Sequence, residues 1–103
     1  KNLEEIVNTE GIDGVFIGPS DLAASMGKLG NSSDKTVEDE IRKALKLIIG
    51  KNKPAGIIAL SNEGGIQRFS QGFDFVAVAH DAHFISKELN LLKSQFSEYL
   101  KKR

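Results

Sequence analysis

Three short apolar runs, none of them interrupted by polar residues at alternate positions, constrain the fold more than any other feature. They lie at residues 14–18, 55–60 and 73–79. Strands that are apolar throughout are typical of parallel sheets, because packed layers cover both faces of such sheets. The runs alternate with helix-forming stretches. This order, with right-handed crossovers, predicts an α/β fold with a parallel sheet.

Helix-forming segments precede, separate and follow these runs. The expected helices cover residues 2–9, 20–26, 35–49, 62–71 and 82–101. Two of them carry a clear apolar stripe at helical spacing, formed by Val37, Ile41, Leu45 and Ile48 in one and by Ile85, Leu89, Leu92, Phe96 and Tyr99 in the other. Asp34 or Thr36 is expected to cap the helix that begins near residue 35.

The predicted sheet has two open edges and no protection at either of them. Neither a lysine nor a proline stands in the middle of an apolar run, although both are common devices on exposed edge strands. One face of a three-stranded sheet would also lack a covering layer. Residues 1–103 are therefore expected to form a single partial domain, a piece of a closed barrel.

The composition excludes several classes of function. Fourteen basic residues balance fourteen acidic ones, so no net field attracts nucleic acid or an anionic membrane surface. The chain has no cysteine, which excludes disulfides and thiol chemistry and fits a cytoplasmic location. No apolar stretch approaches the ~18 residues that a membrane span requires. We expect neither nucleic acid nor a membrane as a partner.

The end of the first apolar run carries the strongest functional signal. The run stops at Gly18-Pro19, and Asp21 follows at the start of an Ala-rich, helix-forming stretch. In parallel α/β proteins, ligand sites are built in the turns after the carboxyl ends of the strands. Asp21 is therefore a candidate ligand for a substrate or a metal ion. The alternative is that Asp21 or Ser20 only caps the following helix.

Residues 18–27 read Gly-Pro-Ser-Asp-Leu-Ala-Ala-Ser-Met-Gly and are followed by Gly30-Asn31. This block resembles the signature of the HpcH/HpaI aldolase and citrate lyase family. It is most similar to the aldolases for 4-hydroxy-2-oxo acids, of the 2-dehydro-3-deoxyglucarate and 4-hydroxy-2-oxoheptanedioate type. Further similar blocks follow in the family's order at residues 53–58, 68–72 and 75–78.

The resemblance implies the carboxyl-terminal part of a TIM (β/α)8 barrel. Family members are barrels of roughly twice this length or more, as is typical of the fold. Residues 1–103 would supply about three βα units, namely the sixth, seventh and eighth strands and the closing helix. In this family the closing helix often packs on a neighbouring subunit, so the last apolar stripe implies a homo-oligomer. Packing within the chain is the alternative.

The resemblance also implies a metal-dependent, class II retro-aldol cleavage that yields pyruvate and an aldehyde. In such enzymes one Glu and one Asp hold a divalent ion, usually Mg²⁺ and alternatively Mn²⁺ or Co²⁺, and Asp21 matches that Asp. The backbone N–H groups of Ser20 and Asp21 match those that bind the pyruvate carboxylate, a 2-oxo acid group. Ile58 matches an apolar position on the aldehyde side of the pocket.

Several family residues have no counterpart here. The Glu ligand, an Arg and the catalytic His lie upstream in the family, so residues 1–103 alone are expected to be inactive. The family has Gly and a small residue where this chain has Ala79 and His80, which favours a surface or rim position for His80 over a catalytic pair with His83. A non-catalytic interaction module of the same scaffold, or a citrate-lyase-like carbon–carbon lyase, is the alternative function.

Overall fold

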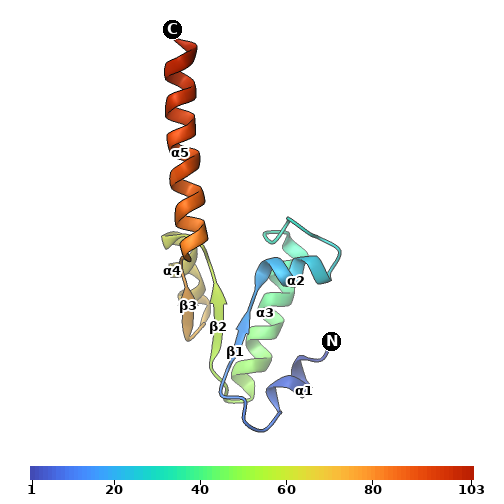
Figure 1. The fold of residues 1–103 in the computed structure, drawn as a ribbon. Helices are drawn as coiled ribbons and strands as arrows, with labels where there is room; N and C mark the ends of the chain where they lie inside the picture. Colours follow the sequence, from blue (N-terminus) through green and yellow to red (C-terminus); the bar gives the residue numbers. More distant parts are fainter.

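Three parallel strands form one sheet in the order β1-β2-β3 (Figure 1). The structure is a computed structural model and describes residues 1–103. The strands are β1 (Val15–Ile17), β2 (Ala55–Ile58) and β3 (Phe75–Ala77). Both neighbouring pairs are parallel, with Val15 opposite Ala55 and Ile57 opposite Val76. The predicted α/β class and parallel sheet are confirmed, although each strand is shorter than its apolar run.

Five helices surround or follow the sheet. They are α1 (Leu3–Val7), α2 (Pro19–Ser25), α3 (Lys35–Gly50), α4 (Asn62–Gln71) and α5 (Asp81–Lys101). Local chemistry sets several of their ends. The Asp34 carboxylate accepts a 2.8 Å hydrogen bond from the N–H of Thr36, so Asp34 is the cap of α3. Gly72, at φ +106°, ends α4 in the left-handed conformation that glycine adopts at little cost.

One face of the sheet packs on α3 and holds the core. The buried apolar residues are Val7, Ile17, Ala23, Val37, Ile41, Leu45, Ile48, Ala55, Ile57 and Phe73. The four predicted stripe residues of α3 are all among them. Burying one large aliphatic side chain of this kind contributes about 1.5–3 kcal/mol. The core therefore depends on a small number of residues.

The opposite face of the sheet has no covering layer. Phe16 on β1 and Phe75 on β3 are 49% and 43% exposed there, with ring centroids 5.9 Å apart. Between them lies Gly56 of β2, where a Cβ atom would come within 2.1 Å of the Phe75 ring. Glycine at this position lets the two aromatic rings meet above β2. The predicted uncovered face is confirmed.

Helix α5 projects away from the rest of the molecule (Figure 1). None of its residues is buried, and the chain extends over 63 × 26 × 23 Å as a result. Its apolar stripe does not pack on this chain's own sheet. None of the helices combines the length and apolar character needed to cross a membrane.

An ion pair between Glu38 and Arg68 joins α3 to α4. Two hydrogen bonds of 2.6 and 2.8 Å run from the guanidinium to the two carboxylate oxygens. The hydrogen bond from Arg68 holds the pKa of Glu38 below its ordinary value of 4.5, against the opposing effect of burial. A carboxyl group whose pKa is lower in the folded state stabilises the fold above its ordinary pKa. That contribution disappears as the pH falls through the lowered pKa.

We expect Glu38→Gln to destabilise the chain by about 1–2 kcal/mol at pH 7 and to weaken its acid sensitivity below about pH 4.5. Urea unfolding at pH 7 and at pH 3 measures both effects. Glu40→Gln is the matched control, because Glu40 pairs only with the exposed Lys43 on its own helix. Equal urea midpoints for the two variants at pH 7 would contradict the expectation.

Candidate active-site edge

The turn between β1 and α2 places the candidate residues at the carboxyl edge of the sheet. Gly18 is the N-cap of α2, with extended backbone at φ −99° and ψ 101°. Pro19 follows as the first helical residue, where its fixed φ and its missing N–H are favourable. Ser20 and Asp21 therefore lie in the first turn of α2, directly after the strand ends.

The side chain of Asp21 is exposed and uncommitted. Its carboxylate takes part in none of the ion pairs, and no side chain caps α2. The capping alternative for Asp21 and for Ser20 is therefore wrong. The carboxylate folds back towards the strand, because its Oδ2 lies 2.9 Å from the place that a Cβ atom on Gly18 would take.

Two backbone donors lie beside this carboxylate. Leu22 is the first residue of α2 whose N–H has a backbone acceptor, the carbonyl of Gly18 at 2.9 Å. The N–H groups of Ser20 and Asp21 precede it and have none. Such free donors, at the positive end of a helix, suit a carboxylate or another anion.

A cleft of about 790 Å³ follows the open edge of β1. Residues of α1, β1, α2 and α3 line it, among them Phe16, Gly18 and Asp21. Nowhere in the chain do three His, Cys, Asp or Glu side chains gather in an arrangement that could hold a metal ion. The Asp21 carboxylate offers hard oxygen atoms of the kind that divalent cations prefer, but it belongs to no such group.

Ile58 shares this edge from the next strand. It is the last residue of β2, it is half-buried, and it lies opposite Ala77, the last residue of β3. Because side chains alternate along a strand, Ile58 lies on the same uncovered face as Phe16 and Phe75. The carboxyl ends of β1 and β2 thus place Asp21 and Ile58 along one edge of the sheet. Ile58 does not line the cleft that Asp21 lines.

The two histidines act locally at the start of α5. The Nδ1 atom of His80 accepts a 3.0 Å hydrogen bond from the N–H of His83, so His80 is the N-cap of the helix. His80 is exposed, as expected of a surface residue. The capping role was not predicted, because histidine is not among the preferred N-cap residues. Its position just before the helix was the available signal.

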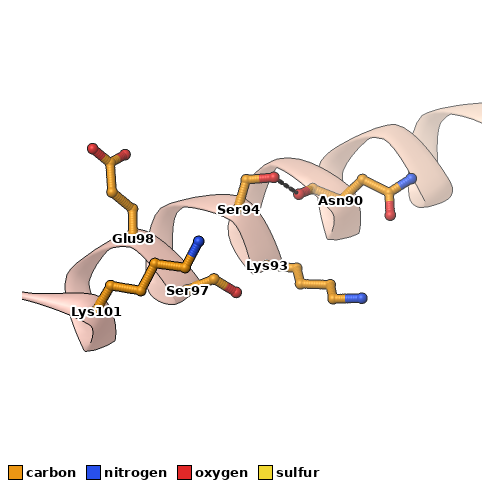
Figure 2. Close-up of a pocket in the computed structure, with 6 residues that line it drawn as sticks. All are labelled: Asn90, Lys93, Ser94, Ser97, Glu98 and Lys101. Carbon is orange, nitrogen blue, oxygen red and sulfur yellow. Dashed lines mark hydrogen bonds between the residues drawn. The ribbon is translucent and has the colours of Figure 1, made fainter.

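The polar hollow on α5 is not a candidate site. Figure 2 shows that its lining residues all project from one face of this helix. They are Asn90, Lys93, Ser94, Ser97, Glu98 and Lys101. The hydrogen bond between them that Figure 2 marks joins Ser94 to the backbone of Asn90, at 2.9 Å. No second element contributes a group, so the hollow is the solvated side of an amphipathic helix.

The chain is similar to known proteins of one family. The sequence profile of the HpcH/HpaI aldolase/citrate lyase family matches residues 1–87. A 4-hydroxy-2-oxovalerate aldolase of Rhodococcus jostii is 38% identical over 94% of the chain, and a hydroxypyruvate/pyruvate aldolase of Deinococcus radiodurans is 39% identical over 95%. The crystal structure of an HpcH/HpaI aldolase/citrate lyase family protein from Burkholderia cenocepacia superposes with a TM-score of 0.79 and 27% identity over 92% of the chain.

The chain spans only part of these proteins. It covers 38% and 35% of the two aldolases and 37% of the Burkholderia protein.

Proposed function

Because the chain belongs to the HpcH/HpaI aldolase/citrate lyase family, we propose that it supplies part of the active site of a class II aldolase. The reaction is the cleavage of a 4-hydroxy-2-oxo acid into pyruvate and an aldehyde. The chain has the fold of three βα units of a (β/α)8 barrel. The observation that carries the proposal is the free carboxylate of Asp21 beside two free N–H groups at the edge where barrel enzymes place their sites.

Each residue of this edge has a distinct task in the proposed reaction. The N–H groups of Ser20 and Asp21 bind the carboxylate of the 2-oxo acid and fix its orientation. The Asp21 carboxylate is one ligand of a divalent cation, with Mg²⁺ as the first choice and Mn²⁺ or Co²⁺ as alternatives. When bound, the cation supplies Lewis-acid stabilisation of the charge that develops during cleavage. Ile58 bounds the aldehyde side with an apolar surface.

We propose that residues 1–103 alone do not turn over substrate. A second carboxylate ligand, an Arg that contacts pyruvate and a catalytic His are needed, and no cluster of three metal-ligating side chains exists in the chain. The cleft along the open edge of β1 has room for a neighbouring strand that carries the second ligand. Support for this reading comes from the chain's share of its relatives, which is 38% and 35% of the two aldolases.

Cation binding by Asp21 is the decisive test. We expect Mn²⁺ to broaden the amide NMR signals of residues 20–22 selectively in the ¹⁵N-labelled chain. Asp21→Asn should weaken this effect at least about tenfold, because it removes the charged ligand oxygen. Asp13→Asn is the matched control. Asp13 is also an exposed carboxylate, but it precedes β1 and therefore lies at the amino-terminal ends of the strands, away from Asp21.

Undiminished broadening in the Asp21→Asn chain, or equal losses in both variants, would contradict a site at Asp21. Pyruvate release by the purified chain from a 4-hydroxy-2-oxo acid would contradict the proposed incompleteness.

We also propose that α5 packs on a second copy of the chain. Its apolar side chains are exposed along the helix, for example Leu92 and Phe96, and the face drawn in Figure 2 is polar. The same observation favours a second candidate function, an interaction module without activity. The two functions differ at Asp21, because an interaction module needs no cation.

A further inference from the structure

Gly18 has no conformational reason to be a glycine. Its φ of −99° and ψ of 101° lie in the extended region, which any L-residue adopts. A Cβ atom built on Gly18 has the Asp21 side chain as its nearest neighbour, with Oδ2 at 2.9 Å and both Cβ and Cγ at 3.7 Å. The space that a larger residue would fill is the space in which the Asp21 carboxylate lies.

Other glycines of the chain have different reasons for their lack of a side chain. Gly56 makes room for the ring of Phe75, and a Cβ on Gly14 would come within 3.1 Å of the backbone oxygen of Pro54. Gly27 and Gly72 adopt positive φ values of 73° and 106°. Gly18 differs from these four because its neighbour is the flexible end of a side chain at the candidate site.

We infer that Gly18 is a positioning residue for Asp21, and this inference rests on the proposed role of Asp21 as a cation ligand. A carboxylate oxygen and a methyl carbon do not approach to 2.9 Å, so a side chain at position 18 forces the Asp21 carboxylate to turn away about χ2 or χ1. That rotation is cheap for the fold, because an exposed aspartate exchanges rotamers at little cost. It is costly for the site, because cation ligands must converge within tenths of an ångström.

Two substitutions separate this role from helix capping. Alanine is a poorer N-cap than glycine, so Gly18→Ala changes both the capping and the space. Serine is a good N-cap and carries the same Cβ atom, so Gly18→Ser changes the space without weakening the cap. Gly50→Ala is the control, since a Cβ on Gly50 has nothing within 4 Å.

The readouts are the orientation of the Asp21 carboxylate without metal, from its ³J couplings and its side-chain carboxyl ¹³C shift, and Mn²⁺ broadening of the amides of residues 20–22. We expect both Gly18 variants to change the carboxylate orientation and to bind Mn²⁺ about 10- to 100-fold more weakly, as is typical when the support of a metal ligand is lost. Gly18→Ser should keep the wild-type urea midpoint, and Gly50→Ala should bind Mn²⁺ as the wild type does.

An unchanged orientation of the Asp21 carboxylate in Gly18→Ser, or Mn²⁺ binding equal to that of the wild type, would overturn the inference. Failure of the proposed function gives a different result, because Asp21→Asn would then leave Mn²⁺ broadening intact. In that case the orientation comparison still decides whether Gly18 sets the position of the Asp21 carboxylate.

Discussion

Ile57→Ala is expected to destabilise the chain by about 2–5 kcal/mol, whereas Ile66→Ala should change its stability by no more than about 0.5 kcal/mol. Ile57 is fully buried in β2, the central strand, between Ile17 on β1 and Val76 on β3. Truncation leaves a cavity under α3 that the rigid sheet cannot fill. Ile66→Ala removes the same atoms from α4, where the side chain of Ile66 is 69% exposed.

The expected loss is large relative to the total stability. Whole domains are stable by about 5–15 kcal/mol, and this core contains ten buried apolar residues. The substituted chain should therefore be partly unfolded at 25 °C. Urea unfolding, monitored by circular dichroism and by exchange of the β2 amides, measures the difference. Similar urea midpoints for the two alanine variants would show that the packing of β2 on α3 does not determine the stability of the fold.

Local sequence chemistry predicted most element positions. Asp34 caps α3 with its own carboxylate, which accepts a hydrogen bond from the N–H of Thr36. Gly72 ends α4 through its own left-handed backbone. Strand lengths depend on partners instead. Residues 73–79 read as one strand, yet the ladder begins only at Phe75, because Asp74 bonds to Ala55 through its side chain at 2.9 Å and its N–H at 2.8 Å. A pattern of apolar residues does not predict a hydrogen bond between residues that are distant in the sequence.

The candidate site was partly visible in the sequence. Asp21 could be singled out because a carboxylate directly after an apolar run lies at a strand end in this fold class. The relation of Gly18 to Asp21 could not, since glycine before Pro19 is equally compatible with a simple turn. The cap formed by His80 was hidden for another reason. Histidine rarely caps helices, so its position had no propensity signal.

Whether the apolar face of α5 packs within the chain was the least predictable feature of the fold. Helical spacing identifies Leu92 and Phe96 as members of one apolar face, and the structure leaves both of them exposed, at 43% and 65%. Periodicity fixes which side of a helix is apolar, but the partner depends on groups that are distant in sequence or belong to another chain.

The double substitution Leu92→Asp with Phe96→Asp is expected to raise the dissociation constant of the self-associated chain at least about a hundredfold. Burial of two such side chains contributes about 3 kcal/mol or more, and each 1.4 kcal/mol corresponds to a factor of ten. Sedimentation equilibrium over a range of concentrations gives the mass of each variant. The matched control is Ser94→Asp with Ser97→Asp, which adds the same two charges to the polar face shown in Figure 2. The control should associate as the wild type does. If the wild type stays monomeric while α5 is helical, or if both double variants dissociate equally, then α5 does not pack on a second copy through its apolar face.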